Sequence, residues 1–177
     1  VTTSTRPDNL TATLKARRDK GGPLAVFDPQ HLAEGIPAGL RWSPVRGCED
    51  PLTAMIRATG AGAGASWPLV AAFIEDLVET ARYLAAASPG ARLDPPALVA
   101  LDEIGNLSPL PSLPVLMAEG GGTGITTMPV LQSLSQARDR WGDHAAGSIW
   151  DASIVKVILG GTSSARDLQD LSALIGE

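Results

Sequence analysis

Cysteine and histidine are scarce in this sequence: Cys48 is the single cysteine, and His31 and His144 are the two histidines. One cysteine cannot form an intramolecular disulfide, and so few ligands cannot assemble a cysteine-based zinc site or a histidine-rich metal site. The small secreted proteins that depend on disulfides are therefore excluded, and a reducing, cytoplasmic compartment fits this usage.

Long apolar runs are also lacking. The best candidate for a membrane segment, residues 67–74, is ended by Glu75 and Asp76. A transmembrane helix needs about 20 predominantly apolar residues. We therefore expect no membrane span within the sequence.

Aromatic and basic residues are few. Aromatics make up 4% of the chain, and 14 Lys and Arg stand against 19 Asp and Glu, which gives a net charge of −5. Binding of nucleic acid through bulk positive charge is excluded, although local basic patches remain compatible with this balance. The 177 residues, 44% of them hydrophobic, suffice for one domain with a core of Ala, Leu, Val and Ile, and 19 Gly and 14 Pro predict many tight turns.

Apolar runs and helical periodicity predict the order of elements. We expect strands at 1–4, 24–27, 40–44, 97–101, 125–131 and 154–159. We expect helices at 8–18, 51–59, 67–87, 112–118, 133–141 and 165–175. The spacing in the helix at 67–87 predicts an apolar face of Leu69, Phe73, Leu77, Ala81 and Leu84. Strands and helices alternate from Leu93 onward, which indicates a mostly parallel α/β sheet flanked by helices, with 97–101 as a central strand covered on both faces.

Polar residues directly follow several expected strands, where ligands of parallel sheets bind. The run at 97–101 ends in Asp102 and Glu103, the pattern of a Walker B strand. In that pattern the Asp associates with Mg²⁺ and the Glu polarises the water that attacks the γ-phosphate of ATP. Gln132, after the next strand, is suited to sense the γ-phosphate, and Ser133 follows it. The alternative is that these are ordinary polar residues at strand ends.

A phosphate-binding P-loop is missing from the sequence. The motif requires a Lys after a glycine-rich loop, but Lys15, Lys20 and Lys156, the only lysines, follow no such loop. The chain as given is therefore expected to be inactive as an ATPase by itself.

Other motifs carry weaker signals. Residues 60–66 superficially match a dinucleotide-binding loop, but the helix expected before them favours a flexible hinge. Residues 120–124 are expected to be a mobile glycine turn. Cys48 is followed by Glu49 and Asp50, and these acidic neighbours disfavour a thiolate nucleophile. Arg138 or Arg140 could reach the phosphates of a neighbouring subunit as a trans arginine, or remain a solvated helix residue.

Two segments carry a family resemblance. Residues 98–107 (LVALDEIGNL) and 124–133 (GITTMPVLQS) resemble the Walker B and sensor segments of TraG/TraD-type coupling proteins of conjugative type IV secretion, most of all the actinobacterial branch. Residues 3–8, 26–29 and 42–44 are also similar to that family, so the resemblance covers nearly the whole chain.

The resemblance implies a RecA-like P-loop NTPase core that couples hydrolysis of ATP, with Mg²⁺, to translocation of single-stranded DNA. Asp102 would be the Mg²⁺-associated carboxylate, Glu103 the water-activating one, Gln132 the γ-phosphate sensor and Ser133 a nucleotide-binding residue. The family also implies a hexameric ring at the cytoplasmic face of the cell membrane, with a relaxase–DNA complex and secretion channel proteins as partners.

The sequence departs from the family in three ways. The P-loop and the membrane anchor are expected upstream of Val1, so residues 1–177 are interpreted as one motor-domain fragment. A helical insertion of the family is expected near 58–60, where the two flanks are joined directly. An arginine that acts in trans in many members near 121–123 has no counterpart here, which leaves Arg138 as a candidate.

Two other functions remain open. A non-catalytic docking or scaffold module of a secretion or conjugation complex would explain the missing P-loop. A small-molecule α/β enzyme using Asp28 and Asp102 would need an acid/base pair that the spacing does not indicate.

Overall fold

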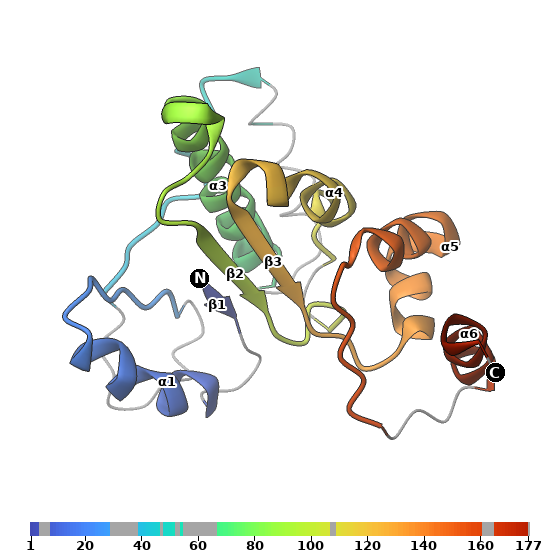
Figure 1. The fold of residues 1–177 in the computed structure, drawn as a ribbon. Helices are drawn as coiled ribbons and strands as arrows, with labels where there is room; N and C mark the ends of the chain where they lie inside the picture. Colours follow the sequence, from blue (N-terminus) through green and yellow to red (C-terminus); the bar gives the residue numbers. More distant parts are fainter. Residues whose placement is uncertain are drawn as a thin grey trace.

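The computed structural model describes residues 1–3, 8–28, 39–46, 48–51, 54, 67–106, 109–160 and 165–176. Strands and helices alternate along most of this part of the chain (Figure 1). The elements are β1 (Thr2–Thr3), α1 (Asp8–Asp19), α3 (Trp67–Ala86), the 3-10 helix η1 (Pro89–Ala91), β2 (Ala97–Leu101), α4 (Leu113–Thr123), β3 (Ile125–Pro129), α5 (Leu134–Ala152) and α6 (Ala165–Ile175). The expected α/β class is confirmed.

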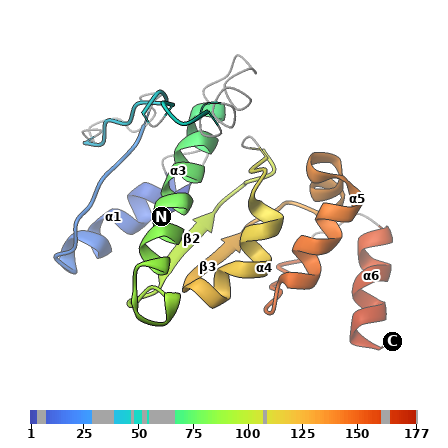
Figure 2. The same cartoon turned by 90° about the horizontal axis from the view of Figure 1, so that it is seen from above.

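The sheet is parallel and has the strand order β1-β2-β3. Thr3 lies opposite Leu101 on one side of β2, and Pro129 lies opposite Leu101 on the other. Figures 1 and 2 show α1 on the β1 side of the sheet and α5 and α6 on the β3 side, so that α1 and α6 lie at opposite ends of the molecule. The central position of the strand at 97–101 among the described strands is as the sequence predicted.

One face of the sheet forms the core. Val99, Leu101 and Ile125 are buried there against Ile74 and Val78 of α3. The same cluster includes residues of α4 and α5 (Leu113, Leu116 and Ile149). Because side chains alternate along a strand, Leu98 and Met128 point to the opposite face.

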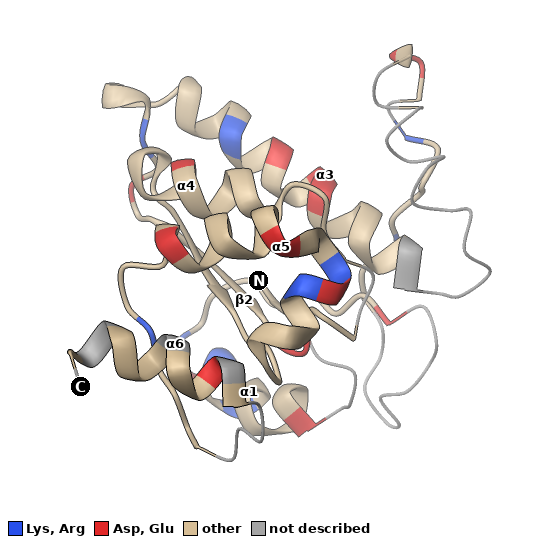
Figure 3. Cartoon of the chain, turned by 90° about the vertical axis from the view of Figure 1, so that its right-hand side faces the viewer, with Lys and Arg blue, Asp and Glu red and all other residues tan. Residues whose placement is uncertain are grey.

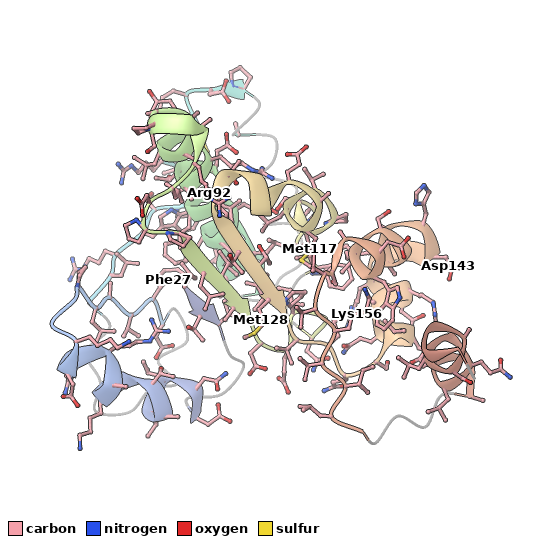
Figure 4. The ribbon with its side chains drawn as sticks, viewed as in Figure 1. Phe27, Arg92, Met117, Met128, Asp143 and Lys156 are labelled. Carbon is pink, nitrogen blue, oxygen red and sulfur yellow. The ribbon has the colours of Figure 1, made fainter. Side chains whose placement is uncertain are left out.

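That opposite face is open. Leu98 is 52% exposed and Met128 is 51% exposed; Figure 4 shows Met128 on β3. The expectation that 97–101 is covered on both faces is wrong for this chain, because the described helices bury only the odd-numbered side of the strand.

Helix α3 begins and ends almost where its pattern predicted, but it presents a different face to the core. Its buried residues are Ala71, Ile74, Val78 and Ala85, whereas Leu84 is 53% exposed. The expected stripe from Leu69 to Leu84 is rotated by about one residue, since several neighbouring stripes of this Ala- and Leu-rich helix are apolar enough to face the sheet.

Helix α4 is longer than the expected helix at 112–118. It continues through the glycines that were expected to form a mobile turn and ends at Gly124, whose left-handed backbone (φ 77°) forms the C-cap. Gly120 packs against the carbonyl of Ile125, where a Cβ atom would not fit. The glycine therefore lets α4 approach the start of β3 closely.

The stretches at 24–27 and 40–44 are not strands. They share one backbone hydrogen bond, from Leu40 N to Val26 O (3.1 Å). Their aromatic residues instead pack on α3: the ring of Phe27 lies 4.5 Å from that of Phe73, and the Trp42 indole donates to Asp76 Oδ2 (2.9 Å). Side-chain contacts, not a backbone ladder, hold this region.

Residues 154–159 are irregular, with a bend at Ile154 and Val155, and belong to no strand among the described residues. Ile154 is 99% exposed and Leu159 is 93% exposed. Figure 1 shows this stretch leaving α5 and descending on the β3 side of the molecule. The expected strand is wrong for this chain, because no described neighbour pairs with it.

The carboxyl-terminal helices differ in how well they were predicted. Helix α6 matches the expected helix at 165–175. Helix α5 continues past Trp141 to Ala152 across a kink at Gly142 (φ 81°, ψ 160°). Within the described residues, no helix combines the length and apolar character needed to cross a membrane. The hinge at 60–66 and the junction at 58–60 lie outside the described residues, and the helix expected at 51–59 is described only at Pro51 and Ala54.

Candidate nucleotide-associated site

Residues 102–106, which we call the acidic turn, follow β2 directly. Ile104 is fully buried in the core and anchors the turn. Asn106 N donates to Glu103 O (2.8 Å) and closes it. Glu103 has a left-handed backbone (φ 50°), which is uncommon for a residue with a side chain. Such an outlier, held by its surroundings, is typical of functional sites.

Asp102 is held from α1. The side-chain amide of Asn9 donates to Asp102 Oδ2 (2.8 Å), across 93 positions of sequence. Asn9 lies in the first turn of α1, which follows β1, so the parallel pairing of β1 with β2 brings the two residues together. The sequence pattern identified Asp102 but not Asn9, since only the strand order places them side by side.

Gln132 and Ser133 lie between β3 and α5. Val130 N donates to Leu101 O (2.9 Å), so the pairing of β2 with β3 continues to the residues where both strands end. The segments that lead from β2 to Asp102 and from β3 to Gln132 therefore begin at the same, carboxyl-terminal edge of the sheet. The Gln132 side chain is exposed, and Ser133 caps α5 by accepting a hydrogen bond from Gln136 N (3.0 Å).

Gln136, which is not among the predicted site residues, connects these two loops. Its Oε1 accepts from Gln132 N (3.1 Å), and its Nε2 donates to Asn106 Oδ1 (2.8 Å). Ser133 and Gln136 have the spacing of a capping box, Ser-x-x-Gln, and this signal could have identified Gln136 as a residue of the helix start.

Arg138 binds within its own chain. Its Nη1 lies 3.0 Å from Asp167 Oδ1 of α6, and its Nε lies 3.8 Å from Asp143 Oδ1. The exposed Arg140 is on the same helix. Figure 3 shows acidic and basic residues interspersed along the described helices that face the viewer.

The donor chemistry of the acidic turn fits one half of a Mg²⁺–nucleotide site. Mg²⁺ prefers carboxylate oxygens and usually takes one or two from the protein, with water and phosphate completing its shell. Among the described residues no group of three or more His, Cys, Asp or Glu gathers to hold a metal by itself. Asp102 and Glu103 therefore suit a cation that phosphate also binds.

The phosphate half of such a site has no counterpart in the lysines of this chain. Lys156 donates to Ser153 O (2.6 Å) and lies over the Trp150 ring (5.0 Å). Lys15 and Lys20 are exposed on and after α1. Elsewhere, Cys48 donates from its thiol to Pro44 O (3.5 Å), and Asp28 is half-buried at the end of the stretch that packs on α3.

One family model matches the carboxyl-terminal part of the chain. Residues 96–177 match the family described as the TraM recognition site of TraD and TraG. The matched region begins just before β2 and includes the acidic turn, Gln132 and α6. No curated protein and no solved structure matches the chain.

Proposed function

We propose, from the premise that residues 96–177 belong to the family of the TraM recognition site of TraD and TraG, that this chain is part of the motor domain of a conjugative coupling protein. The match agrees with the resemblance found in residues 98–107 and 124–133. We propose further that the motor translocates single-stranded DNA, or a relaxase–DNA complex, at the expense of ATP.

The family description also suggests a protein partner. Its name assigns recognition of TraM to this region of TraD and TraG. We therefore propose a TraM-type protein as a partner of residues 96–177, beside the secretion channel proteins. A non-catalytic docking role would need only this contact with a partner. It would not require Asp102 and Glu103 to lie at the same edge of the sheet as Gln132.

The convergence of the acidic turn and Gln132 at one edge of the sheet is the observation that carries the catalytic proposal. In a motor of this kind Mg²⁺ neutralises charge on the phosphates. Asp102, oriented by Asn9, would hold the cation directly or through water. Glu103 would polarise the attacking water, while Gln132 and Ser133 would face the γ-phosphate.

The open side of the sheet supports a RecA-like core that is completed by another segment. Parallel sheets are usually covered on both faces, yet Leu98 and Met128 are half exposed. Residues 154–159 have apolar side chains at five of six positions, as expected of a strand buried on both faces. A further strand beside β3 could pair with residues 154–159 on its other side. A helix following that strand would cover Leu98 and Met128 on the open face of the sheet.

A P-loop unit would have this form. It consists of a strand, a glycine-rich loop with its Lys, and a helix. Beside β3 it would bring its loop to the carboxyl edge of the sheet, where Asp102 and Gln132 lie. We propose that the complete protein supplies this unit, forms a hexameric ring and acts at the cytoplasmic face of the membrane.

The proposal is tested with Glu103→Gln in the complete coupling protein. Loss of the water-polarising carboxylate should lower kcat for ATP at least about 100-fold and leave nucleotide bound. Glu119→Gln, an exposed position on α4, is the matched control and should keep parental activity. An ATPase rate of Glu103→Gln equal to that of the parent overturns the assignment, and absence of ATPase in the parent leaves the docking role.

A further inference from the structure

We propose that Gln136 is a positioning residue that couples Glu103 to Gln132 through a continuous chain of hydrogen bonds. The inference rests on the proposed function for what the coupling achieves, but the chain of contacts belongs to the structure itself. It links the two loops to which separate parts of nucleotide hydrolysis are assigned.

The chain of contacts runs from one loop to the other without a gap. Glu103 O accepts from Asn106 N (2.8 Å), and Asn106 Oδ1 accepts from Gln136 Nε2 (2.8 Å). Gln136 Oε1 then accepts from Gln132 N (3.1 Å). Because a backbone N–H can only donate, Gln136 must turn its Oε1 toward Gln132 N and its Nε2 toward Asn106.

Gly105 provides the space for this bridge. A Cβ atom on Gly105 would lie 2.6 Å from Cδ and 3.0 Å from Cγ of Gln136. Both distances are too short for a Cβ atom, so a larger residue at position 105 would require the Gln136 side chain to shift from its present place. Gly105 is buried by this contact and has no positive φ that would require glycine for the backbone itself.

Helix α5 holds Gln136 in place. Ser133 Oγ accepts from Gln136 N (3.0 Å), which fixes the first turn of the helix. The next residue, Ala137, is almost fully buried, so the start of the helix is packed against the core. The bridge therefore comes from a rigid element, and a shift of the Gln132 loop requires either a shift of the acidic turn or the loss of a hydrogen bond.

The bridge gives Gln136 a role that differs from direct contact with substrate. Sensing of the γ-phosphate by Gln132 and polarisation of water by Glu103 must occur together for hydrolysis to be efficient. A residue that holds the two loops in one arrangement raises kcat without binding nucleotide. Its loss should lower kcat and leave the KM for ATP unchanged.

The test compares three variants of the complete coupling protein. Gln136→Met keeps the length of the side chain and removes both hydrogen bonds. Gln136→Glu is the conservative variant: one carboxylate oxygen accepts from Gln132 N, and the Asn106 amide rotates to donate to the other. Gln169→Met, at an exposed position of α6, is the matched control.

The first measurement is hydrogen exchange of the peptide that contains Gln132. Exchange should be about threefold to tenfold faster in Gln136→Met, because one modest hydrogen bond is lost. It should be unchanged in Gln136→Glu and in Gln169→Met. Unchanged exchange in Gln136→Met overturns the bridge, whether or not the protein hydrolyses ATP.

The second measurement is steady-state ATPase activity. Gln136→Met should have a kcat about tenfold lower than that of the parent and the same KM for ATP. Gln136→Glu should hydrolyse ATP at a rate near that of the parent. Faster exchange with an unchanged kcat overturns the positioning role. A parent without ATPase activity refutes the proposed function, and the exchange measurement still decides whether the bridge exists.

Discussion

Arg138 and Asp167 form an ion pair that joins α5 to α6, with 3.0 Å between Nη1 and Oδ1 and the Asp167 side chain only 4% exposed. Removing one partner of a buried pair leaves the other charge without compensation, which costs about 3–5 kcal/mol. We therefore expect Arg138→Ala to lower the free energy of unfolding by about 3 kcal/mol and to release α6, as measured by urea denaturation and hydrogen exchange.

Arg140→Ala is the control for Arg138→Ala. Arg140 is exposed, and substitutions at such positions usually change stability by less than about 0.5 kcal/mol. Equal stability of the two variants would contradict a structural role for Arg138. It would also leave Arg138 available for the trans arginine role that the sequence suggested.

The glycines of α4 should respond to alanine in opposite directions. At Gly120 a Cβ atom would collide with the Ile125 carbonyl, whereas Gly122 has nothing within 4 Å of the added atom. Gly120→Ala should destabilise the chain by about 1–3 kcal/mol through overpacking. Gly122→Ala should stabilise it by about 0.5 kcal/mol through helix propensity. Thermal unfolding of the two variants measures the difference, and a shift of the same sign in both would contradict the close packing of α4 on β3.

The open face of the sheet predicts an effect that depends on context. In the 177-residue chain Leu98→Ser should be nearly neutral, because the side chain is 52% exposed. In the complete protein it should cost about 1.5–3 kcal/mol if the proposed strand–helix unit covers it. Leu101→Ser, at a fully buried position, should be severely destabilising in both contexts. A neutral Leu98→Ser in the complete protein would count against the RecA-like arrangement.

The contact between Asn9 and Asp102 predicts a salt-dependent effect. Asn9→Asp replaces a donor with a second carboxylate 2.8 Å from the Asp102 oxygen, and the repulsion should weaken as salt screens it. Asn9→Ala should cost about 1–2 kcal/mol without salt dependence. Ala12→Asp adds the same charge at an exposed position of α1 and controls for helix propensity. Urea midpoints at low and high ionic strength would distinguish these cases, and an Asn9→Asp variant with no salt dependence would contradict the contact.

Elements with strong local patterns were predicted closely. Helix α6, with its apolar period, and the strand at 97–101, an unbroken apolar run, have the expected bounds. Residues 154–159 form an equally strong apolar run, but the prediction of a strand there was wrong, because a strand forms only when a neighbour completes its hydrogen bonds. The prediction of a strand at 24–27 was wrong for the same reason.

The candidate site divides in a similar way. Asp102, Glu103, Gln132 and Ser133 were identified because each lies directly after an expected strand. Asn9, Gly105 and Gln136 were not, since Asn9 lies 93 positions from Asp102 and Gln136 lies 30 positions from Asn106. Their partners depend on the strand order and on the packing of α5.

By itself the sequence determined the α/β alternation, the helix ends that have local signals and the identity of the acidic pair, because periodicity and short motifs depend only on near neighbours in the chain. The tertiary structure decided which helix faces are buried, which apolar runs become strands and which residues hold Asp102 and the acidic turn. These depend on pairing and packing between distant segments, and a rotation of α3 by one residue or the lack of one neighbouring strand changes them without altering any local pattern.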